Sequence, residues 1–180
     1  MAEAFFQATA WTMDTPKPYG AFHLVLTVLG VSLSIFLARK FSFPERKAGP
    51  DTILFLCGLF LGLTELYKQG FIYYIENGRT YDWWYFPFQL CSVPMYLGLF
   101  IPMVPARIRN VFYLFIQDFG LLGGIMALAE PSGLMHPYWT MTVHGFLWHF
   151  NLIFMGLICA FYNLKTETPK SYLHTIPLFL

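Results

Sequence analysis

Charged side chains are scarce in this sequence: Asp, Glu, Lys and Arg make up 12% of its 180 residues. A soluble globular domain carries about 25% charged residues, so the deficit argues against a water-soluble protein. The formal net charge is only +1, whereas a nucleic-acid surface needs a clustered excess of Lys and Arg. The composition therefore predicts no nucleic-acid partner.

Cysteine is also rare, occurring only as Cys57, Cys91 and Cys159, each inside an apolar run and without CxxC spacing. An odd number of cysteines leaves one unpaired, and structural zinc sites need closely spaced ligand pairs. We therefore predict no disulfide, no metal site and no cofactor. The first 20 residues lack a basic region followed by an apolar core, so we expect no cleavable signal peptide.

Hydrophobic residues make up 57% of the chain and gather in long runs. A helix needs about 20 apolar residues to cross a hydrocarbon core of about 30 Å. Five runs reach this length, at residues 21–38, 52–74, 84–104, 110–129 and 138–162. A sixth begins at Ser171 but is too short to cross before the last residue. The sequence predicts an all-α polytopic bundle, one transmembrane domain over residues 1–180 with five full spans and a partial sixth. Either the partial sixth lies at the membrane interface, or the chain ends earlier than its fold requires and lacks carboxy-terminal helices.

The basic residues predict the orientation of these spans, because short cytoplasmic loops hold most Lys and Arg of a membrane protein. The odd-numbered loops carry nearly all of them: Arg39, Lys40, Arg46, Lys47, Arg107, Arg109, Lys165 and Lys170. The amino-terminal arm and the even-numbered loops hold only Lys17 and Arg79. This alternation predicts an amino terminus on the outer side.

Three charged residues lie inside predicted spans, where a polar atom needs a partner or a function. Glu65 and Lys68 are three residues apart on one helix face, so they can neutralise each other or contact a polar head group. A structural pair and a direct role in a site both fit this spacing. Asp118 lies near the middle of the fourth span and must pair across helices, take up a proton or face water. The candidate partners are His144, His149 and Lys68.

The fifth span contains His144 and His149, five residues apart and therefore about 140° apart around a helix. This spacing does not suit a metal pair on one face. Either histidine alone fits a structural core residue or a catalytic base.

Cys91 is accompanied by Gln89 and Ser92 between two prolines, which can free backbone groups and supply hydrogen-bond donors. A buried thiol becomes a nucleophile when a base such as histidine lies within hydrogen-bond reach. At about 1.5 Å per helical residue, Cys91 lies roughly 10 Å below Trp84. By this estimate either histidine of the fifth span can reach the thiol.

The motif PFQLCS at residues 87–92 resembles the Pro-Leu-His-Leu-Cys signature of the bacterial YwaF-type membrane proteins, which are related to the eukaryotic transmembrane protein 164 family. Glu65 late in the second span, the glycine-rich QDFGLLGGIMAL and the histidine of GFLWHFN also resemble this pattern. Gln89 replaces the histidine of the signature. The resemblance implies transfer of a fatty acyl chain between phospholipids by a cysteine and a histidine, which fall on Cys91 and His149, with His144 as the second choice.

From these features we expect a lipid acyltransferase or acyl hydrolase in a bacterial plasma membrane, with membrane phospholipid as its substrate and a thioester intermediate on Cys91. Gln89 or Ser92 would stabilise the oxyanion. The polar surround of this site would consist of Glu65, Lys68, Asp118 and His144. The alternative is a small-molecule transporter or substrate-binding membrane subunit without covalent chemistry. The sequence leaves the oligomeric state open.

Overall fold

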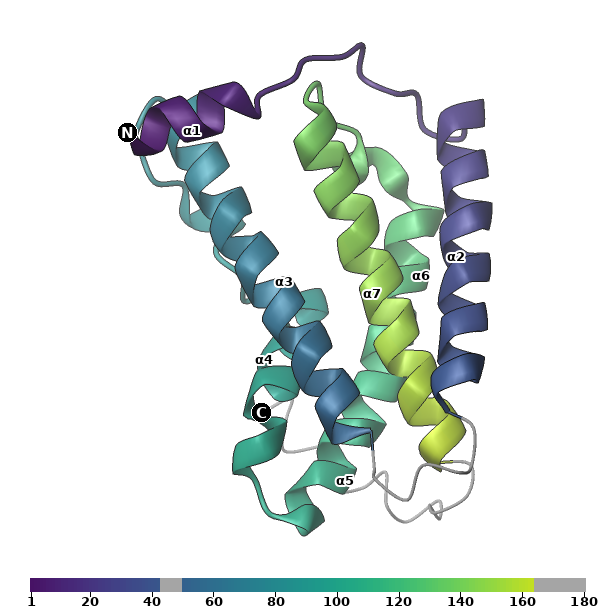
Figure 1. Ribbon diagram of the computed structural model, residues 1–180. Helices are drawn as coiled ribbons and strands as arrows, with labels where there is room; N and C mark the ends of the chain where they lie inside the picture. The colour runs from purple at the N-terminus through teal and green to yellow at the C-terminus, as the bar shows by residue number, and fades with distance from the viewer. Residues whose placement is uncertain (43–49, 164–180) are drawn as a thin grey trace.

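A computed structural model describes residues 1–42 and 50–163, which fold into a helical bundle (Figure 1). The principal helices are α1 (Ala2–Ala8), α2 (Ala21–Phe41), α3 (Asp51–Phe71), α4 (Val93–Phe100), α5 (Ala106–Phe115), α6 (Leu121–Ala129) and α7 (Trp139–Asn163). A π-helical turn, Ile72–Glu76, extends α3, and a second one, Ile116–Gly120, joins α5 to α6. The partial sixth span predicted from Ser171 lies outside the described residues.

Three helices in the described part of the chain are long and apolar enough to cross a membrane: Ala21–Phe41, Ala106–Ala129 and Trp139–Tyr162. They coincide with the predicted runs at residues 21–38, 110–129 and 138–162. α3 has similar length but carries the charges of Glu65 and Lys68. The prediction of an all-helical membrane protein is therefore confirmed.

The run at residues 84–104 differs from the continuous span that we predicted. Its apolar helical part is confined to Leu90–Met103, and the chain before it is irregular or in short 3₁₀ turns. The reason is Pro87, whose ring disfavours helical geometry in the preceding residue; Phe86 is accordingly extended, with φ −63° and ψ 133°. Because no continuous helix joins Trp84 to Cys91, the predicted depth of the thiol, counted at helical rise, does not hold.

Glycines allow the helices to approach closely where the bundle positions the site. A Cβ atom on Gly98 of α4 would lie 2.7 Å from the Leu54 carbonyl oxygen of α3. On α6, a Cβ on Gly124 would lie 2.9 Å from the carbonyl oxygen of His149 in α7. Small residues at such crossings let helix backbones pack directly. Gly98 and Gly124 therefore lie at close helix crossings inside the bundle.

Gly58 and Gly62 of α3 provide a matched test of this packing. A Cβ on Gly58 would lie 2.7 Å from the Leu99 amide nitrogen, whereas one on Gly62 would meet a leucine methyl group at an ordinary 3.6 Å. We expect Gly58→Ala to destabilise the fold by about 1–3 kcal/mol through overpacking. Gly62→Ala should be neutral or stabilising, because alanine favours a helix over glycine by roughly 0.5–1 kcal/mol. Thermal unfolding in detergent micelles measures both, and equal melting temperatures for the two variants would contradict the assigned crossing.

The connecting segments gather at two opposite ends of the bundle (Figure 1). At one end the amino-terminal arm contacts the later loops: the Met13 amide donates to the Pro137 carbonyl at 2.9 Å, and Arg79 pairs with Glu3. At the other end, Arg109 of α5 pairs with Asp51 at the start of α3. The apolar core between these ends includes the fully buried Leu54, Leu61, Leu152 and Met155.

Candidate functional site

A cavity of about 420 Å³ lies between α3, α7, the segment 84–92 and the turn Pro131–Leu134. This volume is within the range of about 300–1,000 Å³ that small-ligand sites occupy. The wall includes the side chains of Lys68, Gln89, Cys91, Ser92, Ser132, His136, His144 and His149. The irregular backbone at residues 86–89 borders this cavity, which is where a membrane protein tolerates non-helical chain.

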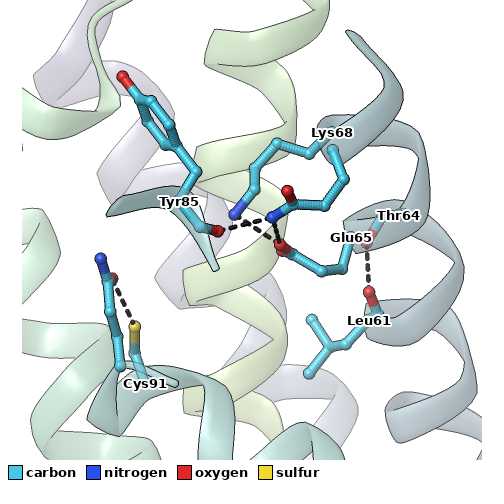
Figure 2. A network of polar contacts seen from close by, with 8 residues as sticks. Leu61, Thr64, Glu65, Lys68, Tyr85 and Cys91 are labelled. Atoms are coloured by element: carbon cyan, nitrogen blue, oxygen red, sulfur yellow. Dashed lines mark hydrogen bonds and ion pairs between the residues drawn. The ribbon is translucent and has the colours of Figure 1, made fainter. Parts of the chain in front are cut away.

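Cys91 lies in the short 3₁₀ turn Leu90–Ser92 that leads into α4. Its thiol donates to the side-chain oxygen Oε1 of Gln89 at 3.7 Å (Figure 2). The turn packs on α6 at a glycine, since a Cβ on Gly123 would lie 3.4 Å from the Cys91 Cβ. The predicted nucleophile is therefore half-buried on the cavity wall, and its hydrogen bond is to Gln89, two residues away.

His149 presents a defined tautomer toward its surroundings. Its Nδ1 lies 2.7 Å from the carbonyl oxygen of Gly145, one turn earlier in α7. A carbonyl oxygen only accepts, so Nδ1 carries the hydrogen of the neutral ring and Nε2 keeps its lone pair. Cys91 and His149 line one cavity and pack on the adjacent glycines 123 and 124 of α6. The two residues that we predicted as nucleophile and base therefore line the same cavity, and each makes its hydrogen bond within its own segment.

His144 lies five residues before His149 in α7 and lines the same cavity. Its ring centroid is 5.6 Å from that of Trp148. Its Nε2 atom is buried, and among the described residues it has no hydrogen-bond partner. His144 is therefore a second histidine on the cavity wall, with one ring nitrogen that is buried and unpaired.

Glu65 and Lys68 form the ion pair predicted from their spacing, with Nζ and Oε1 2.8 Å apart. Gln69 donates through Nε2 to the same carboxylate oxygen at 2.6 Å and to the Tyr85 carbonyl at 2.6 Å (Figure 2). Glu65 is 5% exposed, whereas Lys68 lines the cavity. This network ties α3 to the segment that carries Cys91.

Asp118 takes no part in the cavity. It lies on the π-helical turn Ile116–Gly120 and accepts a hydrogen bond from the neighbouring Gln117 at 3.2 Å. Of its predicted partners, Lys68 pairs with Glu65 and His149 bonds within its own helix. The cavity wall therefore includes Lys68 and His144 of the predicted polar surround, whereas Asp118 and Glu65 do not line it; Glu65 is connected to the wall through its ion pair with Lys68.

Sequence reasoning missed His136, which lines the cavity from the loop before α7. Its Nδ1 lies 3.8 Å from a carboxylate oxygen of Glu76, at the end of the π-helical extension of α3. The missed signal is a histidine beside Pro137 in a loop without Lys or Arg.

Over residues 1–42 and 50–163, no group of three or more His, Cys, Asp or Glu side chains is arranged to hold a metal ion.

Comparison with known proteins identifies a family. A model of the TMEM164 family matches residues 18–180. This range includes every residue that lines the cavity. No curated protein and no solved structure matches the chain.

Proposed function

The chain belongs to the TMEM164 family, and on this premise we propose that it is a membrane-embedded acyltransferase that moves a fatty acyl chain between phospholipids. One observation carries the proposal: the Cys91 thiol of the turn Leu90–Ser92 and the two histidines of α7 line a single cavity inside an apolar bundle. A thiol with a nearby imidazole base is a recurrent nucleophile in acyl transfer. The proposed roles are nucleophile for Cys91 and general base for His149.

In the first half-reaction, the Cys91 thiol gives its proton to Nε2 of His149, and the sulfur attacks the carbonyl carbon of a lipid ester. The new carbon–sulfur bond forms a tetrahedral oxyanion, which collapses by breaking the ester carbon–oxygen bond. The imidazolium then returns the proton to the leaving alkoxide. The products are a thioester on Cys91 and a lysophospholipid.

The second half-reaction reverses these steps with a new acceptor. His149 removes the proton from a lipid hydroxyl, whose oxygen attacks the thioester carbonyl, and the thiolate leaves and is reprotonated by the imidazolium. The donors proposed for the oxyanion are the Gln89 amide N–H groups and the Ser92 hydroxyl, because both side chains line the cavity beside the sulfur. Water as the acceptor would make the protein an acyl hydrolase.

The arrangement of the helix ends supports an assignment of sides. Arg39 and Lys40 end α2, and Arg107 and Arg109 begin α5, at the end opposite the amino-terminal arm. By the positive-inside rule, we propose an outer amino terminus for a bundle with five membrane-crossing segments. The location that we propose for it is a bacterial plasma membrane, from its resemblance to the YwaF-type proteins. Loops of the outer end, at residues 84–87 and 132–136, border the cavity. Its substrate would then come from the outer leaflet.

Trapping the thioester tests the proposal directly. Protein in proteoliposomes is incubated with a phospholipid that carries a radiolabelled acyl chain and is quenched in acid. We expect label on the protein that neutral hydroxylamine removes, because hydroxylamine cleaves thioesters readily. Cys57→Ala should label normally, since Cys57 does not line the cavity. Label on a Cys91→Ala protein, or acyl exchange without any labelled protein, would argue against the thioester route; a transporter would give neither label nor exchange.

A further inference from the structure

In the part of the chain that the structure describes, the side chains on the cavity wall include a positive charge and no negative charge. Among the described residues that line it there is no Asp or Glu, and Lys68 is the one Lys or Arg. The other polar groups include hydrogen-bond donors from His136, His144, Ser92 and Ser132. A cavity with a cation, neutral donors and no carboxylate on its wall favours an anionic ligand group, because a buried anion needs both charge compensation and hydrogen bonds.

The Lys68 ammonium has a fixed position, and its ion pair does not occupy all of its hydrogen-bond donors. An ammonium has three N–H donors, and its ion pair in the structure is with Glu65 Oε1 at 2.8 Å. Glu65 is fixed in turn by Gln69, which also bonds the Tyr85 carbonyl. The Lys68 nitrogen lies 6.0 Å from the centroid of the Trp148 ring on the opposite wall. This places a positioned cation with free donors between α3 and α7, facing the cavity.

Lys68 and Cys91 occupy different levels of the bundle. In Figure 2 the Lys68 ammonium lies beside the Tyr85 carbonyl, and Cys91 lies lower in the view, at about the height of Leu61 on α3. Seven residues separate Leu61 from Lys68, about 10 Å along a helix. A glycerophospholipid entering from the outer end has its phosphate outermost and its ester carbonyls deeper. The same order, cation outward and sulfur inward, is found along this cavity.

We infer that the cavity contains an anion subsite in which the Lys68 ammonium binds a phosphate group. The identification of this phosphate as the phosphodiester of a phospholipid substrate rests on the proposed function. Free inorganic phosphate has the same binding chemistry and is the other source that a test must separate.

The test measures binding without turnover, using full-length protein that carries Cys91→Ala in detergent micelles. Tryptophan fluorescence reports occupancy, because Trp84 and Trp148 line the cavity. The probes are dioctanoyl phosphatidylglycerol, dioctanoylglycerol, which lacks phosphate, and inorganic phosphate. Lys68→Gln is combined with Glu65→Gln so that no buried carboxylate is left unpaired. Arg79→Gln serves as the matched loss of a cation, since exposed Arg79 pairs with Glu3 away from the cavity.

We expect the Glu65→Gln/Lys68→Gln protein to bind phosphatidylglycerol about tenfold or more weakly, the usual loss for a charge-assisted hydrogen bond. Dioctanoylglycerol should bind within about twofold of the parent protein, and Arg79→Gln should change neither affinity. Lys68-dependent binding of inorganic phosphate alone would support the anion subsite and assign it to a soluble ligand. If neither phosphate-bearing probe depends on Lys68, the inference is overturned and Lys68 only neutralises Glu65.

This experiment is independent of the acyl-transfer chemistry. Every protein in it lacks the sulfur, so the result does not change if Cys91 never forms a thioester. Conversely, normal thioester formation together with Lys68-independent binding would leave the proposed function intact and remove the subsite.

Discussion

Replacing Cys91 by alanine is expected to reduce acyl exchange between phospholipids by about 10³-fold or more. The reason is that no thioester can form without the sulfur, and loss of a nucleophile removes the covalent route as a whole. The measurement is mass spectrometry of acyl redistribution between two isotopically distinct phospholipids in proteoliposomes. The wild-type protein and empty liposomes define the two limits of the assay.

Cys57→Ala is the matched control for this substitution. Cys57 is a free, partly buried thiol in the same bundle, and it does not line the cavity. Its loss removes the same atom type and should leave the exchange rate within about twofold of wild type, as expected for a site away from the chemistry. Exchange that survives in Cys91→Ala but falls in Cys57→Ala would place the reaction elsewhere in the bundle.

Replacing His149 by glutamine is expected to lower kcat by about 10²–10⁴-fold with a much smaller change in KM. A positioned general base contributes a factor of this size, and glutamine retains a hydrogen-bonding side chain but cannot accept the thiol proton at neutral pH. Lipid binding should persist, because the substitution leaves the cavity walls in place. Steady-state exchange rates at several donor-lipid fractions separate the two parameters.

His144→Gln decides between the two histidines. His149 has its Nδ1 hydrogen committed to Gly145 and its Nε2 lone pair available, so we expect the His144 substitution to cost less than about tenfold in kcat. A larger loss in His144→Gln than in His149→Gln would transfer the role of base to His144. Equal melting temperatures of the two variants would show that the comparison reports chemistry and not folding.

The ion pair illustrates what local sequence can predict. Glu65 and Lys68 are three residues apart, and helix geometry alone places such residues on one face; the structure has them 2.8 Å apart. The same local rule does not reveal that Gln69 bridges the carboxylate to the Tyr85 carbonyl, which is 16 residues further along the chain. That contact depends on the packing of two segments.

Pro87 illustrates a local signal whose consequence was underestimated. The run at residues 84–104 is apolar enough for a span, so hydropathy alone favours a continuous helix. At residues 86–89 the backbone restriction imposed by proline outweighs the hydropathy of the run. The helical part therefore begins only at Leu90. The irregular chain that results is part of the cavity wall, which is where a membrane protein tolerates non-helical backbone.

Asp118 and His136 show that sequence position does not predict which polar side chains line the cavity. The position of Asp118 in mid-span drew attention to it, yet its π-helical turn lies outside the cavity wall and it accepts from Gln117. His136 attracted no attention in its loop, and it lines the cavity. Position along a span does not give the direction of a side chain relative to neighbouring helices.

The sequence by itself determined the helical membrane character, the i,i+3 ion pair and, through the PFQLCS motif, the family, because these depend on composition, helix periodicity and contiguous residues. Only the tertiary structure decided that Cys91, His144, His149 and Lys68 share one cavity and that Asp118 stays outside it. The physical reason is that the cavity forms where α3, α7 and two loops meet. These elements are held by close helix crossings between residues far apart in the chain, such as Gly98 of α4 against Leu54 of α3, which no local pattern encodes.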